Sequence, residues 1–154
     1  MPDYDLSIVI FGDGSNPAAW QGSHWAFGVQ ETNDSSEKGD LLQVLLLDES
    51  QKWYHFDKRE NVTILDPISE GKIKIATLSS EQNKEVVRLI SQEPAPRDGK
   101  KGCQDWVIEC LLTLETQDFG LIPNGTVDFV SSLVRKPVTY VASQAGEKWT
   151  PTKR

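Results

Sequence analysis

Short apolar runs separated by turn residues predict strands in the first half of the chain. The stretches with this pattern are residues 5–11, 24–31, 41–49, 52–59 and 71–78. The last of them alternates cleanly, with Ile73 and Ile75 on one side and Lys72 and Lys74 on the other, as in a strand with one buried face. The strands follow one another through polar connections and tight turns, so we expect them to form an antiparallel meander.

The apolar period changes to that of a helix in the second half. Ser79 and, three residues later, Gln82 match a capping box, which predicts a helix over residues 80–92. From Cys103 to Gln117 the apolar positions recur at i, i+3, i+4 and i+7, the strongest helical pattern in the chain. Two helices are therefore expected to follow the strands.

The remaining segments are read from Pro, Gly and short apolar runs. Residues 93–102 carry two prolines and two glycines and are predicted to be a loop. A third helix is predicted over residues 126–135. A last strand is predicted over residues 138–143, and the tail 144–154 is expected to be loose. Together these elements predict the α+β class: an antiparallel β-sheet packed against a few helices, in one domain over residues 1–154.

Composition narrows the possible partners. The chain has 154 residues, 38% hydrophobic and 25% charged, and a net charge of -7. The negative charge argues against binding to nucleic acid or to an anionic membrane surface. No apolar run is long enough to span a membrane, and no basic region precedes an apolar stretch at the start, so we expect a cytoplasmic protein. The sequence leaves the oligomeric state open.

Metal and disulfide chemistry find little support. The chain has two cysteines and two histidines, so a zinc site would need carboxylates to complete it. Cys103 and Cys110 lie seven positions apart on one predicted helix, roughly 10 Å at the helical rise, which is too far for a disulfide. We therefore expect free thiols, no metal and no cofactor.

Cys103 is the candidate nucleophile. It stands at the start of a predicted helix, where unpaired amides stabilise an anion, and it follows Lys100, Lys101 and Gly102. This position predicts a partly exposed thiol with a lowered pKa. Cys110, in the middle of the apolar stripe, is expected to be a core residue.

A thiol nucleophile needs a base, and His24 and His55 are the two histidines of the chain. His24 opens a strand directly after a loop, where solvent access and a rigid scaffold meet, and it is the better candidate. His55 fits an ordinary position on a sheet face. Gln43 is the polar residue of an apolar strand, and it either bonds to backbone or water or accepts a hydrogen bond from His24.

These residues resemble a known family. The stretches SHWAFGVQ and GCQDWVIECL, with the histidine strand preceding the cysteine helix, resemble the circularly permuted NlpC-type papain-like fold of lecithin:retinol acyltransferase and its relatives. The chain is also similar to small fungal proteins with NPAHW and NCQDWV motifs. The resemblance implies that Cys103 is the nucleophile, His24 the base and Gln43 the polar orienter. Relatives more often have asparagine at the position of Gly102 and histidine at that of Gln43.

Aromatic residues near this group are candidate substrate contacts. Trp20 and Trp25 could stack on an apolar or aromatic substrate, and Gln104 is counted with them as substrate-binding. Trp106 could do the same, although its place in the helical stripe also fits the core.

Two functions follow from the sequence. The first is a thiol-dependent hydrolase or acyltransferase that acts on an amide, ester or thioester of a small-molecule or peptide-like substrate. One branch of this hypothesis is a tailoring enzyme of fungal small-molecule biosynthesis. The second is a non-catalytic binding module that retains the papain-like fold.

Overall fold

An antiparallel sheet of six strands organises the chain in this computed structural model, which describes residues 2–14, 22–117 and 120–153. The strands are β1 (Tyr4–Phe11), β2 (His24–Glu31), β3 (Lys38–Asp48), β4 (Trp53–Thr63), β5 (Ser69–Leu78) and β6 (Trp149–Pro151). Their order across the sheet is β4-β3-β2-β1-β5-β6, and each neighbouring pair is antiparallel. The α+β prediction is confirmed.

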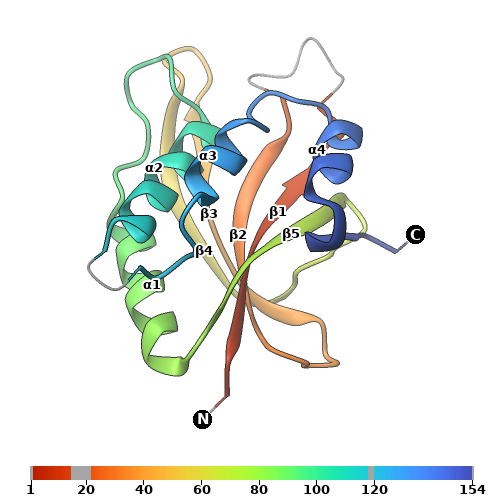
Figure 1. The fold of residues 1–154 in the computed structure, drawn as a ribbon. Coiled ribbons are helices and arrows are strands. Elements are labelled where there is room, and N and C mark those ends of the chain that lie inside the picture. Colours follow the sequence, from red (N-terminus) through yellow and green to blue (C-terminus); the bar gives the residue numbers. More distant parts are fainter. Residues whose placement is uncertain (1, 15–21, 118–119, 154) are drawn as a thin grey trace.

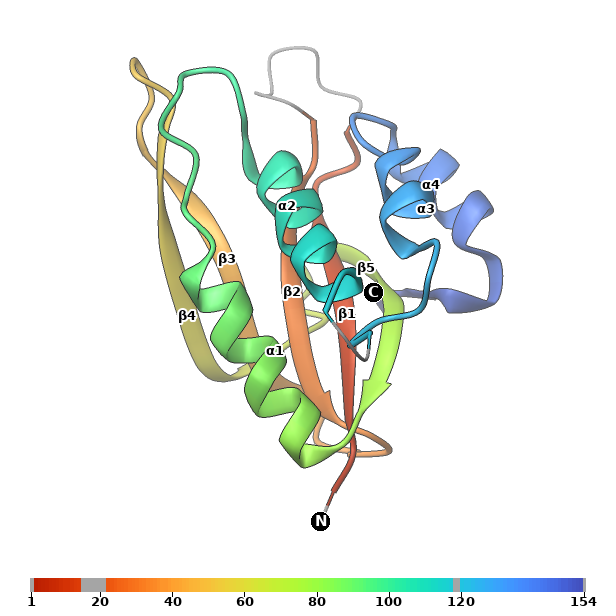
Figure 2. The same ribbon diagram turned by 60° about the vertical axis from the view of Figure 1, so that its left-hand side comes forward.

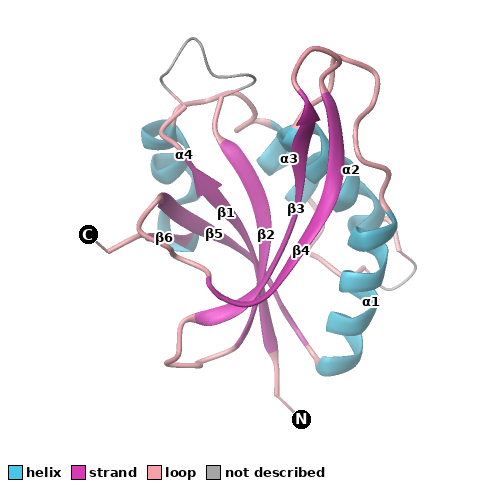
Figure 3. Ribbon diagram, turned by 180° about the vertical axis from the view of Figure 1, so that it is seen from behind, coloured by secondary structure: helices cyan, strands magenta, loops and turns pink. Residues whose placement is uncertain are grey.

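The helices gather on one face of this sheet. They are α1 (Ser80–Gln92), α2 (Cys103–Glu115), α3 (Thr126–Ser131) and α4 (Val138–Ala145), followed by the short 3₁₀ helix η1 (Gly146–Lys148). Figure 1 shows them on the near side of the strands, and Figure 2, turned by 60°, shows α3 and α4 beside the strands. Figure 3, seen from behind, shows the strands in front. In the described parts of the chain, no helix has the length and hydrophobicity needed to cross a membrane.

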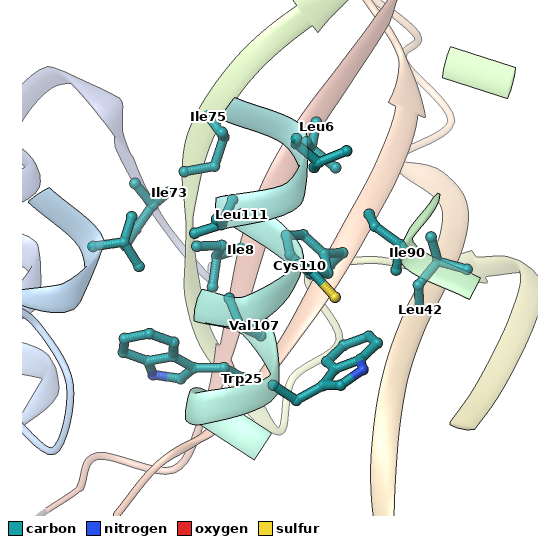
Figure 4. Packing of buried hydrophobic residues seen from close by; sticks show 14 of the residues in the cluster. Leu6, Ile8, Trp25, Leu42, Ile73, Ile75, Ile90, Val107, Cys110 and Leu111 are labelled. Atoms are coloured by element: carbon teal, nitrogen blue, oxygen red, sulfur yellow. The ribbon is translucent and has the colours of Figure 1, made fainter. Parts of the chain in front are cut away.

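The main core fills the space between the sheet and the helices. Figure 4 shows Val107, Cys110 and Leu111 of α2 lying against Leu6 and Ile8 of β1, and all five side chains are almost fully buried. Such a two-layer arrangement buries the apolar stripe of each helix against the apolar face of the sheet. Cys110 is a core residue, as its place in the stripe predicted.

A second, smaller apolar cluster lies on the other face of the sheet. It consists of Val9, Ala26, Leu41 and Ile64. Neighbouring residues of β2 divide between the two faces, since Trp25 belongs to the main core and Ala26 to the small cluster. One sheet face is therefore covered by helices, and on the other Ile64, the residue directly after β4, packs against residues of β1, β2 and β3.

The capping box at Ser79 is confirmed. The backbone amide of Gln82 donates to the Ser79 hydroxyl, and the Gln82 side chain accepts from the backbone amide of Ser79. Two amides at the start of α1 that have no partner within the helix are thus hydrogen-bonded. The predicted helix over residues 126–135 is shorter than expected, because α3 ends at Ser131 and turns follow it.

Two predictions at the end of the chain are wrong. Residues 138–143 belong to helix α4 and not to a strand, because Val141 and Ala145, four positions apart, both face the core from one side of a helix. The tail is not loose, because η1 leads into β6, where Trp149 pairs with Ile73 of β5. A short apolar run does not by itself separate a strand from a buried helix.

Gly71 of β5 reports on the docking of this tail. A Cβ atom at this position would lie 2.6 Å from Trp149 Cη2 and 2.7 Å from the backbone oxygen of Thr150. We expect Gly71→Ala to lower the free energy of unfolding by about 1–3 kcal/mol through overpacking, measured by urea denaturation. In a Trp149→Ala background the same substitution should cost less. Equal costs in both backgrounds would show that β6 does not pack on β5 in solution.

Candidate functional site

The strands β2 and β3 separate at the end of the sheet where β2 begins. β2 pairs with β1 along its whole length, as far as Phe11 opposite His24. It pairs with β3 only over Phe27–Val29. The first three residues of β2 therefore have no ladder partner on the β3 side among the described residues, and this is the place where α2 begins.

Cys103 lies against the backbone of this unpaired stretch. Its sulfur is 3.8 Å from the carbonyl oxygen of Ser23, the residue before His24. The backbone amide of Trp25, the residue after His24, points at the sulfur, as do the amides of Cys103 and Gln104 at the start of α2. The first turn of α2 thus brings the thiol to the peptide groups on both sides of His24.

The prediction of a lowered pKa for the Cys103 thiol is wrong. Burial raises the pKa of Cys103 to about 11, and the three backbone amides that stabilise its thiolate offset only part of that effect. The nearby Asp105 carboxylate raises this pKa further. The side chain is 6% exposed and not partly exposed as predicted. The ammonium group of Lys101 does not lower the pKa of Cys103, because it forms an ion pair with Glu109 at 3.1 Å.

His24 begins a chain of hydrogen bonds on the face of the sheet without helices. Its Nε2 lies 2.7 Å from the side-chain oxygen of Gln43, which is one of the two alternatives that the sequence left open for this residue. The Gln43 amide nitrogen donates to Asp57 at 2.9 Å. Asp57 also accepts from Nε of Arg59 at 3.0 Å. Four residues from three strands are thereby connected.

This chain fixes the tautomer of the imidazole. The Asp57 carboxylate can only accept while it is ionised, so the Gln43 nitrogen must face it and the Gln43 oxygen must face His24. The Gln43 oxygen is an acceptor only, so Nε2 of His24 carries the proton. A neutral His24 then has its lone pair on Nδ1, the nitrogen that can accept a proton.

The charge states of the two groups favour a neutral pair. Burial lowers the pKa of His24, the Gln43 hydrogen bond opposes this shift, and the Arg59 charge adds to it. The Gln43 amide lowers the pKa of Asp57, and Arg59 acts in the same direction. A neutral imidazole, a protonated thiol and an ionised Asp57 are therefore the resting forms at neutral pH.

The structure brings Cys103 to the backbone of His24 but does not hydrogen-bond the two side chains. No hydrogen bond joins the sulfur to the imidazole among the described residues. The imidazole packs instead against Phe11 on the open face, with ring centroids 5.6 Å apart. Cys103 belongs to the core cluster on the helix side. Cys103 therefore contacts the backbone next to His24, but the two side chains do not contact each other through a hydrogen bond.

Two of the three predicted substrate contacts, Trp25 and Gln104, are buried. Trp25 is 1% exposed, because alternation along β2 turns it toward the helices, so it offers no stacking surface. Gln104 is fully buried, and both ends of its amide are used: it donates to the Ser23 carbonyl at 2.8 Å and accepts from the Arg135 amide at 2.7 Å. Trp20 lies outside the described residues.

Trp106 is also a core residue. Its ring meets Phe27 edge to face, with centroids 5.8 Å apart, and its indole N–H donates to the Glu93 carbonyl at 3.3 Å. The main core therefore accounts for this aromatic side chain.

Sequence reasoning missed Asp57. Alternation along β4 places His55, Asp57 and Arg59 on one face, but only the pairing register sets Asp57 opposite Gln43. Within the described parts of the chain, no group of three or more His, Cys, Asp or Glu side chains is arranged to hold a metal ion.

Replacing Gln43 tests the tautomer assignment. In the wild type we expect imidazole ¹⁵N NMR to show protonated Nε2 and unprotonated Nδ1 for His24. Gln43→Leu leaves Asp57 and His24 without this partner, and it should mix the tautomers and cost about 1–3 kcal/mol of stability. Gln51→Leu, at an exposed position in the β3–β4 turn, is the matched control. An unchanged His24 spectrum in Gln43→Leu would refute the assignment.

A comparison with protein families finds one match. A family profile described as "Family of unknown function (DUF6540)" matches residues 15–119, about two thirds of the chain. No curated protein and no solved structure matches the chain. The matched region contains Cys103, His24, Gln43 and Asp57, whereas α3, α4 and β6 lie beyond it.

Proposed function

Since the chain belongs to the DUF6540 family, whose function is unknown, we propose an activity from the site itself: a thiol-dependent hydrolase or acyltransferase acting on an amide, ester or thioester. One observation carries this proposal. The Cys103 sulfur lies against the peptide groups that flank His24, while Gln43 and Asp57 hold the imidazole in the tautomer whose Nδ1 can accept a proton.

The proposed mechanism starts from the neutral pair. As the Cys103 sulfur attacks the carbonyl carbon, Nδ1 of His24 takes the thiol proton, so the thiolate forms only during the attack. The backbone amides of Cys103 and Gln104, in the first turn of α2, are the donors for the oxyanion. The tetrahedral intermediate collapses to a thioester, and the leaving amine, alcohol or thiol takes its proton from His24.

The second half of the reaction releases the acyl group. His24 deprotonates water for hydrolysis, or an acceptor nucleophile for transfer, and the incoming oxygen or nitrogen attacks the thioester carbon. Cys103 leaves as a thiol after proton return from His24. Throughout, Gln43 accepts from Nε2 of His24, and Asp57 keeps the Gln43 amide oriented.

The resemblance to permuted NlpC-type papain-like proteins supports the same assignment. A histidine strand, a strand with a polar orienter and a later cysteine helix occur here in that order as β2, β3 and α2. We extend the proposal to a tailoring enzyme for a small-molecule or peptide-like substrate in the cytoplasm, where two free thiols are stable. The net charge of -7 argues against nucleic acid as the substrate.

Trapping the acyl-enzyme tests the enzyme directly. We expect p-nitrophenyl acetate to acetylate Cys103, seen as one added acetyl group on the peptide that contains it by mass spectrometry. Cys103→Ala should lose this adduct, whereas Cys110→Ala, which removes the thiol of the core, should keep it. Acetylation that persists in Cys103→Ala, or falls on Cys110, would exclude Cys103 as the nucleophile.

A binding module without catalysis is the second candidate, and the burial of Cys103 favours it. The side chain is 6% exposed and its pKa is raised to about 11. A thiol of this kind reacts slowly, because only the thiolate fraction is nucleophilic. In this case the same residues stabilise the fold, and α2 begins with an inert cysteine.

The pH dependence of acylation separates the two candidates. Burial lowers the pKa of His24 below its usual 6.5, so general-base catalysis predicts a rate of Cys103 acetylation that levels off above about pH 7. His24→Gln should abolish this plateau. For a binding module, the rate should rise about tenfold per pH unit toward pH 11, following the thiolate, and His24→Gln should leave it unchanged.

A further inference from the structure

The face of the sheet opposite the helices carries a continuous groove. Two adjoining pockets of about 230 and 340 Å³ lie on it and share four lining residues, Phe11, Leu41, Arg59 and Ile68. His24 and Gln43 line the smaller pocket, and Lys38 and Asn61 line the larger one. Figure 3 shows this side of the sheet, which no helix covers.

The floor and wall of the groove are apolar. Leu41 belongs to the small apolar cluster, and Phe11 packs against that cluster. Ile68 also lines both pockets, and at 75% exposure it is the most exposed large hydrophobic side chain in the described part of the chain. An exposed isoleucine next to an aromatic ring and a leucine gives a flat apolar ligand two sides to contact.

The polar groups of the groove favour an anion. Arg59 gives one donor, Nε, to Asp57, and its guanidinium has further N–H donors on a side chain that is 58% exposed. Lys38 has no ion pair among the described residues. Asp66, the acid in the larger pocket, already accepts from the Ile68 amide at 3.0 Å. Arg59 and Lys38 thus line one groove of a chain whose net charge is -7.

We propose that this groove binds a small carboxylate with a flat apolar body. The body lies on Phe11 and Leu41 beside Ile68, and the carboxylate meets the guanidinium of Arg59, with Lys38 at the far end. Two cations on a short groove suit one acidic group and not a polyanion such as nucleic acid. The site is formed without Cys103, so it goes beyond the proposed thiol chemistry and holds for either candidate function.

Binding is measured on Cys103→Ala, which removes the thiol reaction from the experiment. The probes are 2-naphthoate and its neutral counterpart 2-naphthylmethanol, titrated by isothermal calorimetry at low and at high salt. We expect 2-naphthoate to bind at least about tenfold more tightly, with an advantage that shrinks as salt is added. In ¹⁵N–¹H NMR spectra the shifted amides should be those of the groove, including Phe11, Leu41 and Ile68.

Two variants with a matched control test the contacts. Arg59→Gln should weaken 2-naphthoate about tenfold or more and leave 2-naphthylmethanol unchanged. Lys58→Gln removes the same charge from the next position of β4, on the opposite face, and should leave both probes unchanged. Ile68→Asp should weaken both probes, because it places a charge on the apolar wall. Folding of each variant is checked by its circular dichroism spectrum.

The outcomes separate this proposal from the thiol mechanism. Equal affinity for both probes, equal effects of Arg59→Gln and Lys58→Gln, or shifted amides confined to the helix face would each overturn the carboxylate site. Acetylation of Cys103 does not enter any of these measurements. A groove that binds 2-naphthoate in a chain without acylation would leave this proposal intact and refute the proposed enzyme.

Discussion

Alternation along β2 is the constraint on which the arrangement of the site depends. Successive side chains of a strand point to opposite faces, so Trp25 enters the core beneath the helices while His24 turns to the open face. The two residues are neighbours in sequence, but their side chains lie on opposite faces of the sheet. Because β3 pairs with β2 only from Phe27 onward, α2 can begin against the strand and set Cys103 beside the backbone between the two layers.

The loss of solvation on burial sets the protonation states of Cys103 and His24. The start of a helix stabilises a thiolate, and three backbone amides face the Cys103 sulfur, yet burial has the larger effect and raises its pKa. Burial lowers the pKa of His24 at the same time. Both groups are thus held neutral by one cause, so any proton transfer between them belongs to the reaction step and not to the resting state. Asp57 supports this state at a distance, since its charge orients Gln43 without contacting the imidazole.

The open face gives the molecule a surface that the thiol does not require. His24 and Gln43 line one end of a groove whose other lining residues include Arg59 and Ile68. The hydrogen-bonded chain from His24 to Arg59 therefore borders both the proposed reacting group and the proposed anion contact. A ligand in the groove would meet the side of the imidazole that faces away from the core.

The sequence by itself determined the strands β1 to β5 and the helices α1 and α2, because periodicity is a local signal. It also marked Gln43 as a polar residue that needs a partner, but it left open whether that partner is His24 or the backbone and water. It did not determine the end of the chain, since a short run such as residues 138–143 becomes helix or strand according to what it packs against. Nor did it determine the partner of Gln43 across the sheet, Asp57, which depends on register. Only the tertiary structure decided that Cys103 is buried, because the solvation of a side chain is set by the elements that cover it and not by its neighbours in sequence.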